Sequence, residues 1–224
     1  RDLRGEAIDR DYAEVRRYWE PIVEITQIKG DSETHPVLAP GDAFADFERY
    51  PYYIQREWTD YVPQRGDYVR SALKVGLELD AKIGFNPYQF GVIGSTDAHT
   101  SLASAEEPNF WGKMSTDSIP VNKRGPASGD YANGKTSTNG WTMSASGLAA
   151  VWSEDNSREA IIAAMKRRET YATTGPRIGV RFFGGWGYQQ EDIQAADLAA
   201  VGYAGGVPMG GELASAPTGA APRF

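Results

Sequence analysis

A strand, a helix and a second strand follow one another between residues 22 and 94, and this order constrains the fold more than any other feature. Residues 22–28 are mostly β-branched, as in a strand. Residues 68–83 place apolar side chains at helical spacing, with Asp67 as the expected N-cap and Gly84 as the stop. Residues 90–94 are apolar throughout, which is typical of a parallel strand buried on both faces. The pattern predicts a β-α-β unit and therefore an α/β fold.

Parallel strands joined by a crossover helix end at the same edge of their sheet, so loops 29–36 and 95–101 are expected to lie together. In α/β proteins this edge is where active sites are built. Both histidines of the chain, His35 and His99, fall in these two loops. We therefore expect Gly30 and Asp97 at one edge of a parallel sheet.

Further elements are predicted outside this unit. Helices are expected over residues 9–19, 43–49 and 156–168, the last with Asn156 and Glu159 resembling a capping box. A strand is expected over 178–183. Residues 100–156 are rich in Gly, Ser, Thr and Asn and are predicted to form a flexible insertion, while 185–224 are predicted to be a Gly/Ala/Pro-rich linker or the start of a β-rich region. A domain boundary is placed near residue 184.

The strongest chemical signal is Asp97-Ala98-His99, directly after the second strand. A carboxylate and an imidazole two residues apart in an open loop suit Zn, Mn or Fe, although an ordinary turn with Asp97 capping a backbone N–H would give the same sequence. Glu33 and His35 form a second such pair, with a rigid turn at Pro36 as the alternative.

Three further residues are weaker candidates. Lys29 and Arg177 could bind an anionic substrate, or could form structural salt bridges. The role of Glu24, inside the first strand, stays open.

Composition excludes several other classes. The net charge of −7 and the lack of a basic run argue against a nucleic-acid partner. The chain has no cysteine, which removes thiolate metal sites and cysteine nucleophiles. No stretch approaches the roughly 20 apolar residues of a membrane span. Residues 129–136 match a phosphate-binding loop, but no apolar strand precedes them and no helical pattern follows.

Four segments carry a family resemblance: residues 27–36, 91–99, 144–152 and 167–177. They resemble a bacterial domain-of-unknown-function family, numbered 3604, which is itself similar to the PHP (polymerase and histidinol phosphatase) metallohydrolases. The resemblance implies a distorted TIM-like barrel with two or three divalent metals at the ends of its parallel strands. Asp97 and His99 match the last Asp-x-His metal motif of that group. The further histidines of a PHP site are absent, because the chain has only two.

The sequence therefore predicts residues 1–184 to be the C-terminal part of a PHP-like barrel that hydrolyses a small phosphate or related ester through a metal-activated water. Asp97 and His99 are the expected catalytic metal ligands. We expect the activity to need an N-terminal portion or a second chain that supplies the missing ligands. The alternatives are a carbohydrate- or peptide-binding module, which would use the Trp-rich insertion, and an inactive structural domain.

Overall fold

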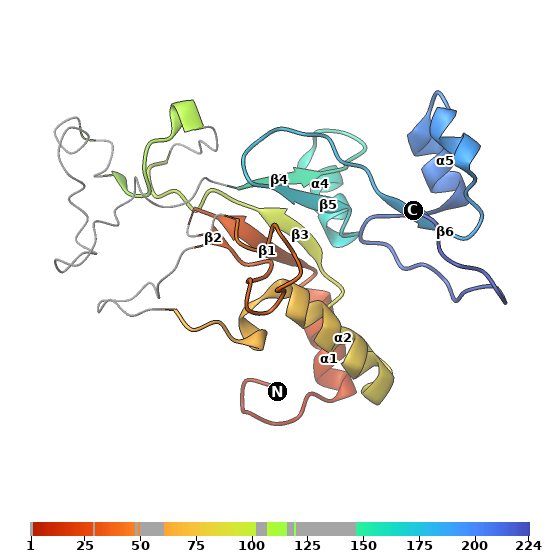
Figure 1. Ribbon diagram of the computed structural model, residues 1–224, viewed down its shortest axis with the longest axis horizontal. Coiled ribbons are helices and arrows are strands. Elements are labelled where there is room, and N and C mark those ends of the chain that lie inside the picture. Colours follow the sequence, from red (N-terminus) through yellow and green to blue (C-terminus); the bar gives the residue numbers. More distant parts are fainter. Residues whose placement is uncertain are drawn as a thin grey trace.

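The computed structural model describes residues 2–28, 30–47, 49, 61–101, 107–115, 119 and 147–224. Helices and strands are interspersed along the chain (Figure 1). The helices are α1 Arg10–Trp19, α2 Val69–Ile83, α4 Arg158–Lys166 and α5 Leu198–Gly205, with 3-10 turns at Arg65–Asp67, Glu107–Asn109 and Gln190–Gln194. The strands are β1 Ile22–Gln27, β2 Gly30–Asp31, β3 Gly91–Gly94, β4 Leu148–Val151, β5 Thr170–Thr173, β6 Phe183–Gly185 and β7 Gly206–Pro208.

The β-α-β unit predicted from the sequence is confirmed. β1 and β3 pair in parallel, with Val23 opposite Val92, and α2 lies between them in the chain. β2 pairs antiparallel with the end of β1, which places Gly30 opposite Gln27. Gly30 and the loop that carries Asp97 therefore follow the carboxyl ends of β1 and β3, at one edge of the sheet.

The predicted barrel is not confirmed. The described strands form three small sheets, ordered β2-β1-β3, β4-β5 and β6-β7, and none of these sheets closes on itself. A closed barrel requires every strand to pair on both sides. Here the first sheet stops at β2, a two-residue strand that turns back on β1 instead of leading to another crossover helix. The fold of the described residues is a mixed α/β arrangement of small sheets.

β4 and β5 pack closely against β3 through glycines. A Cβ atom on Gly91 would lie 2.8 Å from Thr170 Oγ1, and one on Gly94 would lie 2.9 Å from the carbonyl oxygen of Leu148. Since Leu148 pairs with Thr173, β5 runs beside β3 in the same direction. The carboxyl ends of β1, β3 and β5 thus share one edge.

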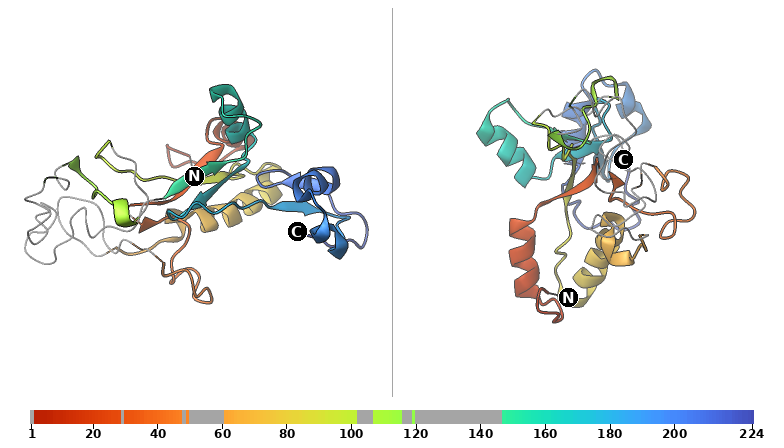
Figure 2. Two further views of the ribbon diagram at one scale, coloured as in Figure 1. Left: turned by 90° about the horizontal axis from the view of Figure 1, so that it is seen from above. Right: turned by 90° about the vertical axis from the view of Figure 1, so that its left-hand side faces the viewer.

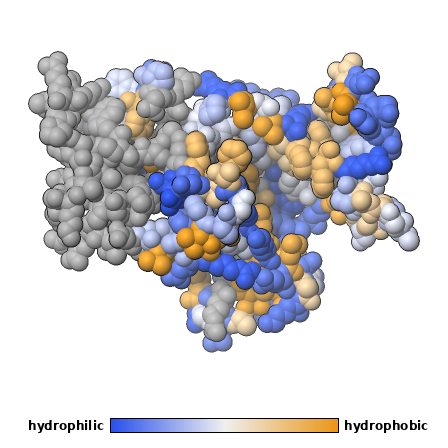
Figure 3. All heavy atoms as spheres, in the orientation of Figure 1, coloured by the Kyte–Doolittle hydropathy of each residue, from blue (hydrophilic) through white to orange (hydrophobic). Residues whose placement is uncertain are grey.

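α1 and α2 lie together on one side of this sheet, and α4 lies away from them (Figures 1 and 2). The Arg10 guanidinium donates to the carbonyl of Gly84 at 3.0 Å, which ties the start of α1 to the end of α2. Side chains such as Val15 on α1 and Leu77 on α2 remain exposed, and Figure 3 shows hydrophobic patches among polar ones in this lower part of the molecule. No helix in the described ranges is long and apolar enough to cross a membrane.

The structure corrects two predicted helix caps. Tyr68, not Asp67, is the N-cap of α2, because Asp67 belongs to the preceding 3-10 turn, where its carboxylate accepts from Tyr61 Oη at 2.8 Å. Gly84 ends α2 in the left-handed conformation, as predicted. Ser157, not Asn156, caps α4, since its hydroxyl accepts from the backbone N–H of Ala160.

The cap assignment on α4 gives a direct test. Ser157→Ala is expected to lower the free energy of unfolding by about 1 kcal/mol, because the Ala160 N–H loses its acceptor. Asn156→Ala should change it little. Urea denaturation of both variants measures the difference, and a larger loss in Asn156→Ala would contradict the assignment.

Three other predictions from the sequence need correction. Residues 43–47 form turns instead of a helix, with the Asp42 carboxylate accepting from the Phe44 N–H at 2.9 Å. Residues 178–182 form no strand, and the carbonyls of Ile178 and Val180 accept instead from Tyr171 Oη and Trp152 Nε1. The last part of the predicted insertion contains β4, whose uninterrupted apolar run resembles that of β3.

The C-terminal part contains two strands and a helix. β6 pairs with β7, α5 lies between them in the chain, and Gly185 also bridges to Arg223 near the C-terminus. Residue 184 falls within β6. The domain boundary near that residue stays a prediction.

Candidate functional site

Asp97 and His99 lie in the loop that follows β3. The N–H of Ser95 donates to the carbonyl of Thr26 at 3.0 Å, so the loop starts from a fixed point on β1. Asp97 has a φ of 42°, in the left-handed region that short polar side chains tolerate better than most. The N–H of His99 donates to the carbonyl of Lys113 at 2.7 Å, which brings a distant segment against the loop.

Three charged or titratable side chains meet at this point. His99 Nε2 lies 3.3 Å from Asp97 Oδ1, and Lys113 Nζ lies 2.6 Å from Asp97 Oδ2. The Lys113 ammonium also contacts the Asp97 carbonyl and lies 3.2 Å from His99 Nε2. Its side chain is only 4% exposed, whereas that of His99 is 54% exposed. The arrangement holds a positive charge between a carboxylate and an imidazole, with the imidazole open to solvent.

Lys113 was not identified from the sequence. It lies 14 residues beyond His99 within the region predicted to be a flexible insertion, and no motif or periodicity connects the two. The phosphate-loop match at 129–136 is outside the described residues.

Glu24 lies inside β1, opposite Ile93, and its side chain contacts the start of the same loop. Its carboxylate accepts a hydrogen bond from the hydroxyl of Ser95, the residue that follows β3. Glu24 lies in β1 one strand away, so the contact ties β1 to the loop of Asp97. This assigns Glu24 a positioning contact at the edge where Asp97 and His99 lie.

Glu33 and His35 are in a separate cluster of ion pairs and rings. Arg70 pairs with Glu33 and, at 2.7 Å, with Asp42. His35 is buried, and its Nε2 lies 3.0 Å from a guanidinium nitrogen of Arg49. Burial and the charge of Arg49 lower the pKa of His35, which favours the neutral ring.

These residues do not join Asp97 and His99. Within the described part of the chain, no group of three or more His, Cys, Asp or Glu side chains could hold a metal ion. The Val37 N–H also points at His35 Nδ1 at 3.2 Å, so donors face both ring nitrogens. The metal role predicted for Glu33 and His35 stays a prediction that this geometry does not favour.

The structure describes one of the two weaker anion-binding candidates. Arg177 is exposed in the segment after β5, whose carboxyl end shares the edge of the sheet with Gly94. Lys29 lies outside the described residues.

Asp31, in β2, is a half-buried carboxyl group next to Glu33. Burial, the largest effect, and the charge of Glu33 raise its pKa to about 6 from 3.8, although the N–H groups of Glu33 and Thr34 and the charge of Arg70 oppose the rise. The folded state therefore binds a proton more tightly than the unfolded chain. This group's contribution to stability is fully present below about pH 3.8 and is lost as the pH rises through about 6.

The Asp31→Asn substitution should remove the loss of stability that Asp31 causes as the pH rises. We expect the free energy of unfolding at pH 7 to rise by about 1 kcal/mol relative to the unsubstituted protein, after allowance for solvent screening, and the difference to vanish near pH 3.5. Denaturation curves of the two proteins at a series of pH values test this, because the other titrating groups cancel in the difference. A gap that stays constant with pH would contradict the assignment.

The chain was compared with known protein families, curated proteins and solved structures. A family model described as "Protein of unknown function (DUF3604)" matches residues 1–224. No curated protein and no solved structure matches the chain.

Proposed function

The chain belongs to the DUF3604 family, which is described as of unknown function, and we propose from the chemistry of its site that it is a metal-dependent hydrolase of phosphate or related esters. The observation that carries the proposal is the meeting of Asp97, His99 and the buried ammonium of Lys113 at the carboxyl edge of β1 and β3. This position in an α/β fold is where catalytic groups gather.

The donor types at this point fit a divalent cation. A carboxylate and an imidazole 3.3 Å apart match the ligand preferences of Zn, Mn and Fe. The Lys113 ammonium shows that the Asp97 oxygens are directed at a positive charge. Catalytic zinc sites use about three protein ligands, so further ligands are needed beyond these two side chains. The resemblance to PHP proteins implies that an N-terminal portion or a second chain supplies them.

Each residue has a defined part in the proposal. Asp97 and His99 would hold the metal, which when bound would lower the pKa of a water molecule and stabilise the anion that develops during hydrolysis. Lys113 supplies a buried positive charge beside the same point, where it would attract the anionic group of an ester. Ser95 and Glu24 hold the start of the loop against β1.

The binding-module alternative receives less support. Trp152 is one of the tryptophans that a carbohydrate would stack on, but the Arg181 guanidinium covers its ring at 3.9 Å. Its Nε1 donates to the carbonyl of Val180 at 2.8 Å. Trp152 is therefore engaged within the protein.

The test is metal binding together with hydrolysis. The protein is stripped with a chelator, reloaded separately with Zn, Mn or Fe(II), and analysed for metal content and for turnover of 4-nitrophenyl phosphate. Hydrolysis is assayed on the full-length protein. Metal binding is measured on the full-length protein and on the 224-residue chain. We expect turnover that disappears on chelation and returns with one of the metals. Turnover that survives chelation, or a protein that takes up none of the metals, would overturn the proposal.

A further inference from the structure

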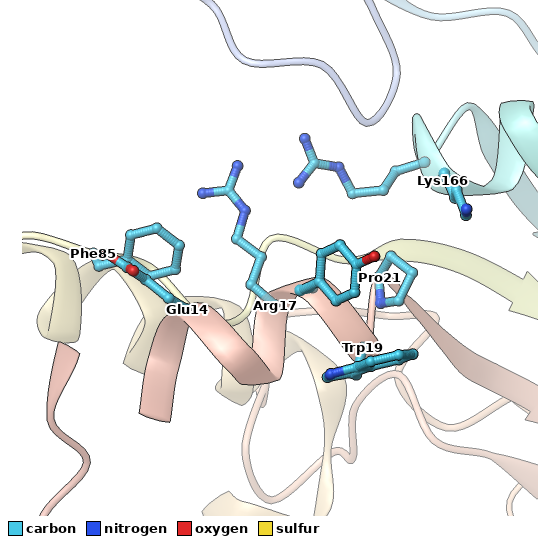
Figure 4. Close-up of a pocket in the computed structure, with 8 residues that line it drawn as sticks. Glu14, Arg17, Trp19, Pro21, Phe85 and Lys166 are labelled. Carbon is cyan, nitrogen blue, oxygen red and sulfur yellow. The ribbon is translucent and has the colours of Figure 1, made fainter. Parts of the chain in front are cut away.

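A second site candidate lies at the opposite edge of the parallel strands from Asp97. It is a pocket of about 590 Å³, within the size range of small-molecule sites. Its walls come from the end of α1, from Phe85 after α2, and from Lys166 and Arg168 before β5 (Figure 4). Pro21, which precedes β1, also lines it, so the pocket faces the amino ends of β1 and β5.

Positive charge predominates in the pocket. Arg17, Lys166 and Arg168 line it, and Lys166 makes no ion pair with the described part of the chain. Glu14 also lines the pocket, but its carboxylate pairs with Arg10 at 2.7 Å. The pocket therefore has three cationic side chains, two of which, Arg17 and Arg168, contact Glu212.

Arg168 is held in place before any ligand arrives. Its Nε donates to the Gly210 carbonyl at 2.9 Å, and a terminal nitrogen donates to the Gln89 carbonyl at 3.3 Å. Its backbone has a φ of 65°, the left-handed conformation in which helices commonly end, and the Glu169 N–H donates to the Ala164 carbonyl to close α4. The guanidinium is thus oriented without loss of side-chain entropy on binding.

The carboxylate of Glu212 already pairs with two of the three cationic side chains. The same oxygen of Glu212 contacts Arg17 and, at 3.4 Å, Arg168. The second distance is longer than the roughly 2.8 Å of a strong charge-assisted hydrogen bond. Glu212 is 52% exposed and lies in a segment without helix or strand. The Glu212 carboxylate therefore makes the contacts that the negative group of a bound ligand would make.

Aromatic rings flank the same opening. Tyr18 and Trp19 are each 74% exposed and meet edge to face, with ring centroids 4.9 Å apart. Phe85 lies on the other side, 5.2 Å beneath the Arg17 guanidinium. Exposed rings beside fixed cations suit a ligand that is anionic at one end and flat and apolar at the other.

We propose that this pocket binds an oxyanion, phosphate or carboxylate, carried on an aromatic ring, with the oxyanion displacing Glu212 from Arg17 and Arg168. The pocket and the Asp97 loop are at opposite ends of β3, so this inference does not depend on the proposed hydrolysis.

Calorimetric titration of the 224-residue chain tests the proposal, with phenylphosphonate, benzoate and inorganic phosphate as probes. Phenylphosphonate has a carbon–phosphorus bond and is not a phosphoester substrate. We expect it to bind about two- to tenfold more tightly than inorganic phosphate, because it adds ring contacts. Its comparison with benzoate separates phosphate from carboxylate preference. Equal affinity for phenylphosphonate and inorganic phosphate would overturn the aromatic part of the proposal.

Substitutions in the pocket show whether Glu212 and the cations form a ligand-binding site or only hold the C-terminal segment in place. Arg17→Met and Lys166→Met should each weaken phenylphosphonate binding about tenfold. Glu212→Gln should tighten it about two- to fivefold, because the internal competitor loses its charge. Glu78→Gln is the matched control. It makes the same charge change on α2, where Glu78 forms an exposed pair with Arg65 of the preceding 3-10 turn, and should leave affinity unchanged.

Two results would overturn the proposal. One is a Glu212→Gln protein that binds phenylphosphonate no more tightly while its thermal midpoint falls, since Glu212 would then serve only to anchor its segment. The other is loss of binding in His99→Ala, which is expected to keep its stability, so that the ligand would have to bind at the other edge of the sheet. Arg168→Met alone would not test ligand binding, because the Arg168 side chain also donates to the Gly210 and Gln89 carbonyls and so supports the fold.

Discussion

Asp97→Ala is expected to abolish metal uptake at the loop after β3 and to reduce metal-dependent hydrolysis by about a thousandfold or more. The variant loses one of the two proposed side-chain ligands and also leaves the buried Lys113 ammonium without its carboxylate. A buried charge that loses its partner is costly, so the thermal midpoint should also fall. Metal analysis and 4-nitrophenyl phosphate turnover measure the first effect, and a thermal melt the second.

A double variant separates these two effects. Asp97→Ala combined with Lys113→Met removes the unpaired charge, so the thermal midpoint should return toward that of the unsubstituted protein while hydrolysis stays absent. His99→Ala removes the other proposed ligand and leaves the Asp97–Lys113 pair intact. It should lose turnover with little change in stability. If both ligand variants keep normal turnover, these residues do not hold a catalytic metal.

Gly94→Val should have the largest effect on stability, a loss of about 3 kcal/mol in the free energy of unfolding. A side chain at the end of β3 would place its Cβ 2.9 Å from the Leu148 carbonyl and 2.9 Å from Thr26 Cγ2. The backbone of β4 must then move away from β3. Gly179→Val is the control, because a Cβ there meets nothing within 4 Å. Equal urea midpoints for the two variants would mean that β4 does not pack against β3 as described.

The sequence predicted the part of the site that depends on the order of elements. Because residues 22–28 and 90–94 have strand character and a helix intervenes, the parallel pairing of β1 and β3 could be inferred, and with it the edge where Asp97 lies. The proximity of Asp97 and His99 follows from their spacing within one loop. These are local features or topological rules, and both can be read from a single sequence.

Lys113 and Glu212 could not be predicted because each acts through contacts between distant segments. Lys113 reaches Asp97 across 16 residues, and Glu212 reaches Arg17 across 195. Neither lies in a motif, and a lone lysine or glutamate in a polar stretch is usually solvated. The barrel expectation came from the family resemblance, and β2 shows why the described strands depart from it: its two residues turn back on β1.

The chain leaves the sheet and returns to it at almost the same place, since the Gly147 N–H donates to the Ser95 carbonyl at 2.9 Å. Closing a longer loop between such neighbouring ends costs little, about 0.6 kcal/mol for each doubling of its length. The segment between them can therefore gain or lose residues over evolution without disturbing β3 or β4. Asp97 and Lys113 both belong to that segment, but Asp97 lies two residues beyond Ser95, at the fixed start, and Lys113 lies 16 residues further on. The charge beside the carboxylate can therefore change between family members while the sheet that carries Asp97 is retained.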